Sequence, residues 1–238
     1  MLEEIHMSEG PYPEAFYTKE DKKIVINDWE EVMKPMKRRR GLSWYNRVGP
    51  LAVCFGLNMN AYSRRYSPEY SVHNLCREFE CLTATLRIYK GGISPDKHNK
   101  LYIEDARSIR EKAYIPIEGD LEIDQIIAGY ERFFKDTEKC RYGGNIIEFE
   151  DFVWVCGWTK KAEKIEYALN VAYNRLKAND WWFRYLSSEN GQYVEGRFDE
   201  WFRKLEESAW DGDRLNAIYE SELIKHKLEK IPERKILF

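Results

Sequence analysis

The chain has 238 residues, of which 15% are aromatic and 33% charged, and its formal net charge at pH 7 is −3. A chain of this length buries enough apolar surface to fold unaided, and its aromatic content excludes an intrinsically disordered protein. No apolar run reaches the ~20 residues that cross a bilayer, and the first residues lack the basic and apolar regions of a signal peptide. We therefore expect a cytoplasmic protein whose five cysteines are reduced thiols.

Charged residues are arranged in blocks along the chain. Residues 1–33 contain three basic and nine acidic side chains, residues 34–100 contain thirteen basic and four acidic, and residues 118–211 contain thirteen basic and twenty acidic. Such blocks either attract one another across a fold or form faces that meet charged partners. The pattern leaves both roles open.

The first regular element is a helix. Apolar residues recur at helical spacing from Asp21 onward. Pro35 should kink or shorten this helix, and Gly41 should stop it after Arg39 or Arg40.

A group of extended segments follows the helix. The first two flank the turn Val48-Gly49-Pro50 and predict a hairpin. The extended segments are residues 43–47, 51–58, 70–75 and 80–89. Together they predict an antiparallel sheet of about four strands, preceded by the helix and packed by the helices that come later.

The second half of the chain has mostly helical periodicity. Residues 121–134 place apolar side chains on one helical stripe, whereas the apolar run 149–158 fits either a buried strand or a helix. Three further apolar faces lie within residues 162–176, 198–205 and 215–228, the last capped by Asp211 or Asp213. We therefore expect an α+β protein in which a helix-plus-sheet module, residues 1–100, packs with a mostly helical region, residues 101–238, as one globular unit.

Three potential metal ligands, His73, Cys76 and Cys81, lie close together in the sequence. Zinc sites take four ligands and commonly use a CxxC pair, which this segment lacks. A cysteine nucleophile needs a lowered thiol pKa, and Arg77 is the one nearby group that would lower it. We expect structural thiols, no metal site and no cofactor.

Basic and aromatic residues interleave in the first half of the chain. Guanidinium groups bind phosphates and aromatic rings stack on bases, so this combination suits a nucleic-acid surface. The overall negative charge argues against that function. The residues concerned are Lys37, Arg38, Arg39, Arg40, Arg47, Arg64 and Arg65 with Trp44, Tyr45, Tyr62 and Tyr66.

Two clusters of carboxylates are candidates for metal binding or acid–base chemistry. Neither is followed by the lysine or histidine that a metal-dependent nuclease would add, and the second cluster suits the N-terminus of a helix. The clusters are Glu148, Glu150 and Asp151, and Glu118, Asp120, Glu122 and Asp124. The chain also lacks a Gly-rich phosphate loop, a GxSxG motif and an HExxH motif.

Residues 41–47 (GLSWYNR), the strand that follows them and residues 67–71 (SPEYS) resemble a bacterial domain family of unknown function. Its pattern is a short helix, a G-L-S-W-Y-x-R strand start, an S-x-x-Y-S loop and a strand that ends in Asn-Leu. Where the family has glycine after Asn-Leu, this chain has Cys76. The resemblance implies a cytoplasmic accessory protein and supplies no catalytic residues.

The favoured function is a non-catalytic bacterial module that binds another protein, with an immunity protein that neutralises a toxin or effector as its most concrete form. Aromatic anchors and opposite charge blocks suit protein recognition. The alternative is a protein that binds or processes nucleic acid through the basic sheet face and a carboxylate cluster. We expect the partner-binding residues to include Trp44, Tyr45, Arg47, Arg64, Arg65, Tyr66, Trp181 and Trp182. For the last two, an interior position between the sheet and the helices is the competing interpretation.

Overall fold

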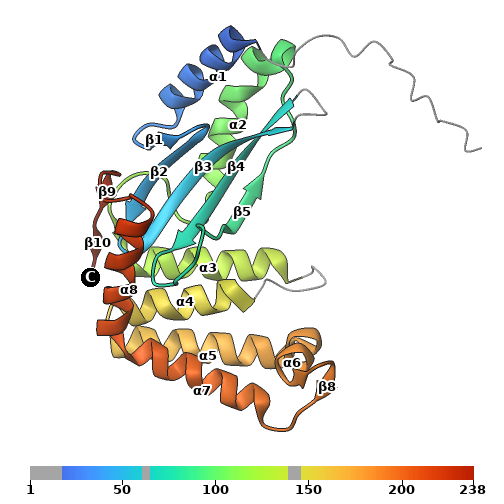
Figure 1. Cartoon of the computed structure of the whole chain (residues 1–238), viewed down its shortest axis with the longest axis vertical. Coiled ribbons are helices and arrows are strands. Elements are labelled where there is room, and N and C mark those ends of the chain that lie inside the picture. The colour runs from blue at the N-terminus through green and yellow to red at the C-terminus, as the bar shows by residue number, and fades with distance from the viewer. Residues whose placement is uncertain (1–17, 61–64, 139–145) are drawn as a thin grey trace, which may run out of the picture.

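A computed structural model describes residues 18–60, 65–138 and 146–238 and shows an α+β fold (Figure 1). The main sheet is antiparallel, with the strand order β1-β2-β3-β4-β5. Its strands are β1 (Lys37–Arg40), β2 (Ser43–Val48), β3 (Leu51–Asn60), β4 (Arg65–Asn74) and β5 (Thr85–Tyr89). The helices are α1 (Lys19–Val32), α2 (His98–Lys112), α3 (Ile123–Thr137), α4 (Ile146–Trp158), α5 (Ala162–Ala178), α6 (Asp180–Leu186), α7 (Arg197–Trp210) and α8 (Gly212–Lys225), with a single 3₁₀ turn, η1 (Pro95–Lys97), before α2.

Helix α1 begins at a capping box, in which Thr18 and Asp21 each accept a hydrogen bond from the other's backbone N–H. The prediction that this helix runs to Arg39 or Arg40 is wrong. It ends at Val32, before Pro35, and the basic run forms the edge strand β1, whose backbone pairs with β2. Pairing along the sheet edge outweighs the helical spacing of the preceding apolar residues.

The predicted hairpin is confirmed. Val48 pairs with Leu51 across the two-residue turn Gly49-Pro50, and Gly49 has a φ of 50°, which a residue with a Cβ rarely adopts. A Cβ on Gly49 would also lie 2.3 Å from Ile236 Cδ1.

Strand β4 is longer than predicted and includes Pro68, which is paired with Leu57 of β3. The Pro68 carbonyl accepts a hydrogen bond from the N–H of Lys90, just beyond the end of β5. The N–H and C=O of a residue in an antiparallel strand point toward the same neighbouring strand. The N–H that Pro68 lacks would therefore point toward the end of β5, where few ladder hydrogen bonds remain to be lost. Strand β5 is shorter than predicted, since residues 80–84 do not belong to it.

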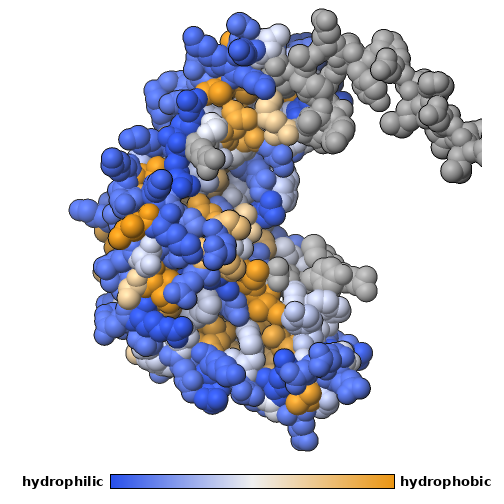
Figure 2. Space-filling view, viewed as in Figure 1, coloured by the Kyte–Doolittle hydropathy of each residue, from blue (hydrophilic) through white to orange (hydrophobic). Residues whose placement is uncertain are grey.

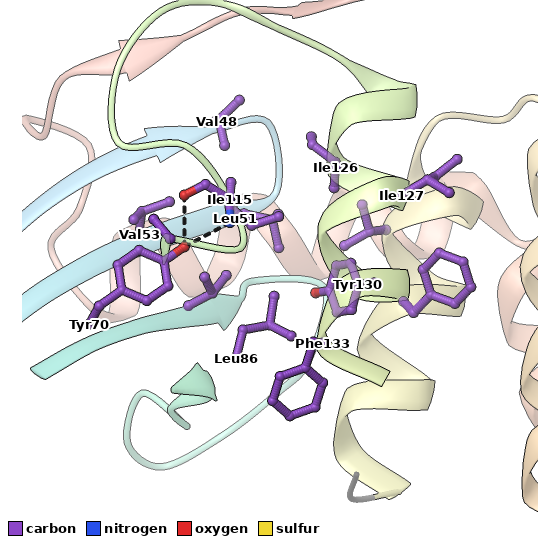
Figure 3. Packing of buried hydrophobic residues seen from close by; sticks show 14 of the residues in the cluster. Val48, Leu51, Val53, Tyr70, Leu86, Ile115, Ile126, Ile127, Tyr130 and Phe133 are labelled. Carbon is purple, nitrogen blue, oxygen red and sulfur yellow. Dashed lines mark hydrogen bonds between the residues drawn. The ribbon is translucent and has the colours of Figure 1, made fainter. Parts of the chain in front are cut away.

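The two faces of the sheet are covered differently. Alternate residues such as Trp44, Val53 and Tyr70 face a large hydrophobic cluster that includes side chains of α1 to α7. Figure 3 shows part of this cluster, where Tyr70 donates a hydrogen bond to the Ile115 carbonyl and accepts one from its N–H. On the opposite face, Tyr45 belongs to a smaller cluster with residues of α8 and of the segment that follows it.

Helix α4 resolves the ambiguous run 149–158. It packs against α5, α7 and α8, and most of its residues are buried. A helix enclosed on all sides needs no polar face, which explains why its sequence has no helical period. Helix α2 was not predicted, because its segment is polar and buries only His98, Ala106 and Ile109.

The end of the chain returns to the sheet. Strand β9 (Glu233–Arg234) pairs in parallel with β2, and β10 (Ile236–Leu237) pairs in parallel with β6 (Leu121–Glu122). Arg234 donates a hydrogen bond to the Gly119 carbonyl at 3.1 Å. This segment therefore fastens the sheet to the start of α3.

Helices α3, α4, α5 and α7 lie side by side below the sheet, and α6 with the hairpin of β7 (Ser188–Glu189) and β8 (Gln192–Tyr193) lies at the end of this stack farthest from α1 (Figure 1). In the space-filling view of Figure 2, hydrophilic residues dominate the edges of the molecule, and hydrophobic residues are visible toward its middle. Among the described residues, no helix is both long and apolar enough to span a membrane.

Candidate functional site

Two of the predicted partner-binding rings, Trp44 and Tyr66, lie in the core and are fully buried. Tyr66 is enclosed by a chain of hydrogen bonds. The Trp29 indole N–H donates to its hydroxyl at 3.0 Å, and the hydroxyl lies 2.6 Å from His98 Nδ1. His98 Nε2 lies 3.0 Å from an Asp28 oxygen. These contacts join α1 and α2 to the sheet, so they stabilise the fold and leave these rings no surface for a partner.

The side chains on the opposite face of β2 are also covered. Tyr45 is buried beneath Arg39, whose guanidinium lies 5.7 Å from the ring centre. Arg47 is buried and donates hydrogen bonds to the Tyr219 hydroxyl at 2.8 Å and to Glu233 at 3.0 Å. Arg47 therefore links β2 to α8 and to the end of the chain.

The side chains of Arg38 and Arg39 in β1 do not form one basic patch. Arg38 and Arg39 point to different sides of the strand, since Arg38 lies 4.0 Å from Glu30 of α1 and Arg39 donates to the His226 carbonyl. Arg65 is exposed at the start of β4. Tyr62 and Arg64 lie outside the described residues.

The cysteine and histidine candidates are not gathered into a site. Within the described ranges, no group of three or more potential ligands could hold a metal ion. Burial lowers the pKa of His73 to about 4 and raises the pKa of the Cys76 thiol well above its ordinary value, while Cys81 is exposed. A buried thiol held in its protonated form is a poor nucleophile.

Arg77 occupies the first carboxylate cluster. Its guanidinium lies 2.6 Å from Glu150 and 2.9 Å from Asp151, and its centre lies 4.3 Å from the Trp154 ring centre. Burial raises the pKa of Asp151 to about 6, against the opposing effect of Arg77. The cluster fixes the segment after β4 to α4.

The second carboxylate cluster surrounds the start of α3. Glu122 is the N-cap of α3 and forms a capping box with Gln125. Asp120 accepts a hydrogen bond from the N–H of Lys235, and Asp124 pairs with Lys164 at 2.5 Å. These contacts agree with the prediction of a helix cap.

A large open groove of about 1240 Å³ lies between α6, the β7–β8 hairpin and the first turns of α7. We call it the aromatic groove, because Trp181, Tyr185 and Trp201 line it together with polar and charged side chains. Its remaining lining residues are Asp180, Arg184, Leu186, Ser188, Glu189, Asn190, Gly191, Val194, Glu195, Gly196, Arg197, Glu200 and Lys204.

Helix α6 positions the rings of the aromatic groove. Asn179 caps the helix by accepting a hydrogen bond from the N–H of Trp182 at 3.1 Å. Trp181 and Tyr185 are separated by one helical turn, and their rings stack with centroids 5.5 Å apart and planes 6° apart. Trp182 is 7% exposed and nearly perpendicular to both rings, whereas Trp181 is 38% and Tyr185 59% exposed. Trp182 therefore supports a pair of rings that face solvent.

The β7–β8 hairpin forms another wall of the groove. Glu189 pairs with Gln192 across Asn190-Gly191, both of which have positive φ. This hairpin was not predicted, although an Asn-Gly pair is a strong sequence signal for such a turn. Tyr185 and Trp201 were not predicted as site residues either, and the i, i+4 spacing of Trp181 and Tyr185 is the signal that links Tyr185 to the groove.

The basic side chains of the groove are each paired with a carboxylate of the groove. Arg184 lies 3.0 Å from Asp180, Arg197 lies 3.0 Å from Glu189, and Lys204 lies 2.8 Å from Glu200. With Glu195, the lining carries four acidic and three basic side chains. The groove is thus an aromatic surface within a nearly neutral rim.

The Trp181–Trp182 pair was expected either at a partner-binding surface or in the interior between the sheet and the helices. Neither position describes both rings. Helix α6 packs against α5 and α7, and Figure 1 places it away from the sheet. Trp182 is buried there and Trp181 is exposed. Binding of a partner by Trp181, by Trp182 or by Arg65 stays a prediction.

Comparisons of the chain with protein-family models, with curated proteins and with solved structures give no match. The candidate site therefore rests on its own geometry.

Proposed function

We propose that this protein is a non-catalytic module that binds another protein through the aromatic groove. The observation that carries the proposal is the stacked Trp181–Tyr185 pair, which is exposed at the wall of a groove of about 1240 Å³. Tryptophan and tyrosine are enriched among the residues that dominate binding energy at protein interfaces.

The support of the ring pair favours binding. Trp182 and the Asn179 cap hold the rings in place, so a partner would order few rotatable bonds when it binds. Tryptophan and tyrosine each combine an apolar ring face with a polar N–H or O–H group. This combination suits a surface that contacts water in the free protein and is buried by a partner in the complex.

Bacterial origin, a cytoplasmic location and neutralisation of a toxin or effector are the more specific parts of the proposal. The neighbouring genes test them, because an adjacent toxin gene supports the immunity function and a position among unrelated metabolic genes contradicts it.

Peptide selection tests the binding function directly. A library of displayed peptides is selected on the full-length protein, and the affinities of the enriched peptides are measured by fluorescence anisotropy. We expect Trp181→Ala to weaken binding by about 10-fold or more, as truncation of an anchor residue does.

Trp210→Ala is the matched control, because Trp210 is 46% exposed and lies outside the groove lining. Peptides that bind both variants as tightly as the unmodified protein would contradict the proposal, and so would a library that yields no binder.

A further inference from the structure

We propose that the occupant of the aromatic groove is an uncharged, proline-rich segment of a partner protein in the polyproline II conformation. This inference rests on the proposed function and specifies its partner.

The charge of the groove limits the class of partner. Its three basic side chains each pair with a carboxylate of the same groove, at 2.8 to 3.0 Å. Because each cation is already paired, a nucleic acid or an acidic peptide would gain little net attraction, and a basic peptide would find one further carboxylate, Glu195, on the lining. An uncharged segment does not depend on such an attraction.

The size and openness of the groove favour a polypeptide over a small molecule. Pockets for small ligands have volumes of roughly 300–1,000 Å³ and enclose most of the ligand surface. This groove has a volume of about 1240 Å³ and lies open between two helices and a hairpin.

The rings favour proline among uncharged segments. A polyproline II helix has no internal hydrogen bonds, so its carbonyl groups can accept hydrogen bonds from indole N–H and tyrosine O–H groups while its rings lie on aromatic faces. Trp181, Tyr185 and Trp201 line one groove and are the residue types that carry such faces and donor groups. Because the segment is already extended before it binds, it loses little conformational entropy.

Strand addition is the other way in which an extended segment can bind, and the hairpin beside the groove is too short for it. Strands β7 and β8 contain two residues each, so their edges offer few backbone hydrogen bonds. The groove is lined by three aromatic residues but by only two strand residues, Ser188 and Glu189 of β7.

A fluorescein-labelled decaproline peptide tests the proposal, with an equally long Gly-Ser peptide as the comparison probe. We expect the full-length protein to bind decaproline in fluorescence anisotropy and to bind the Gly-Ser peptide at least about 10-fold more weakly. Because no charge is exchanged, raising NaCl from 0.05 to 0.5 M should change the dissociation constant by less than about 2-fold.

Two pairs of variants locate the binding. Trp181→Ala and Tyr185→Ala should each weaken decaproline binding by about 10-fold or more, while Trp210→Ala and Tyr193→Ala should leave it unchanged. Tyr193 is 66% exposed and does not line the groove, so it matches Tyr185 in exposure. Circular dichroism and thermal melting confirm that each variant is folded.

The outcomes separate this inference from the proposed function. If decaproline does not bind while selected peptides without proline bind in a Trp181-dependent way, the partner class is wrong and the binding function stands. If neither decaproline nor any selected peptide binds, both fail. Equal loss of decaproline binding in Trp210→Ala would also overturn the proposed location.

Discussion

Two aromatic clusters in this protein have similar compositions and opposite environments. Where α1 packs on the sheet, Trp29, Phe55 and Tyr66 are fully buried, and Trp29 stacks on Phe55 with ring centroids 4.8 Å apart. In the aromatic groove, Trp181 stacks on Tyr185 at 5.5 Å, and both face solvent. Stacking is common to both clusters, so stacking alone does not distinguish a core from a binding surface.

The exposure of the rings distinguishes the clusters. The Trp29 indole N–H and the Tyr66 hydroxyl belong to a buried network that ends at Asp28. In the groove, where α6 packs on α5 and α7, Trp181 is 38% and Tyr185 59% exposed. We infer that the first cluster contributes to stability and the second to recognition.

The largest expected difference is in the free energy of unfolding. Trp29→Ala should lower it by about 4 kcal/mol, because the substitution removes a fully buried ring and leaves a cavity. Trp181→Ala should lower it by less, about 1 kcal/mol, because the ring is 38% exposed and therefore buries less apolar surface than Trp29 does. Urea unfolding monitored by circular dichroism measures both values, and similar losses in the two variants would remove the distinction between the clusters.

The buried region beneath α8 should also show a pH dependence. Burial lowers the pKa of His73 from 6.5 to about 4, so between these values the unfolded chain binds a proton that the folded chain does not. His226, Arg87 and Arg39 add positive charge around this ring. The stabilisation is complete above pH 6.5 and is lost as the pH falls through about 4, which corresponds to about 3 kcal/mol.

Comparison with His73→Gln tests that linkage. The unfolding free energy of the variant should vary less between pH 6.5 and pH 4 than that of the unmodified protein. Parallel pH profiles would show that His73 does not cause the acid sensitivity.

A smaller effect is expected from a single hydroxyl group in the buried cluster. Tyr66→Phe removes the partner of both Trp29 Nε1 and His98 Nδ1 and should cost about 2 kcal/mol of unfolding free energy. Tyr185→Phe is the matched change in the groove and should cost less than about 0.5 kcal/mol. A Tyr66→Phe variant as stable as the unmodified protein would show that the network is not a source of stability.

The smallest expected effect concerns nucleic acid. A labelled single strand should show no gel shift with micromolar protein at low ionic strength, because the side chains of Arg38 and Arg39 have separate intramolecular contacts and the net charge is −3. A shift that weakens steeply with salt would restore nucleic-acid binding as a function.

The sequence predicts the fold class well because the elements that define it have clear periods. Strands β2 and β3 alternate around a Gly-Pro turn, and the apolar stripe of α3 repeats at helical spacing. Helix α2 and the strand character of residues 37–40 do not follow from local pattern, since both depend on the neighbours that they pack or pair with.

The candidate site is less predictable for the same reason. Trp44 and Trp181 both stand among charged and aromatic residues in the sequence, and their burial depends on which helices cover them. Trp181 and Trp182 are adjacent in the chain, yet one is exposed and the other buried, because the two side chains leave α6 in different directions. The packing of α6 on α5 and α7 contributes to this difference.

The most direct test follows each tryptophan while a partner binds. The eight tryptophans can be labelled with 5-fluorotryptophan and their fluorine NMR signals assigned with Trp→Phe variants. When decaproline or a selected peptide is added, the signals of Trp181 and Trp201 should shift, while those of Trp29, Trp44 and Trp210 should stay in place. Unchanged Trp181 and Trp201 signals during saturable binding would contradict the assignment of the aromatic groove as the binding site.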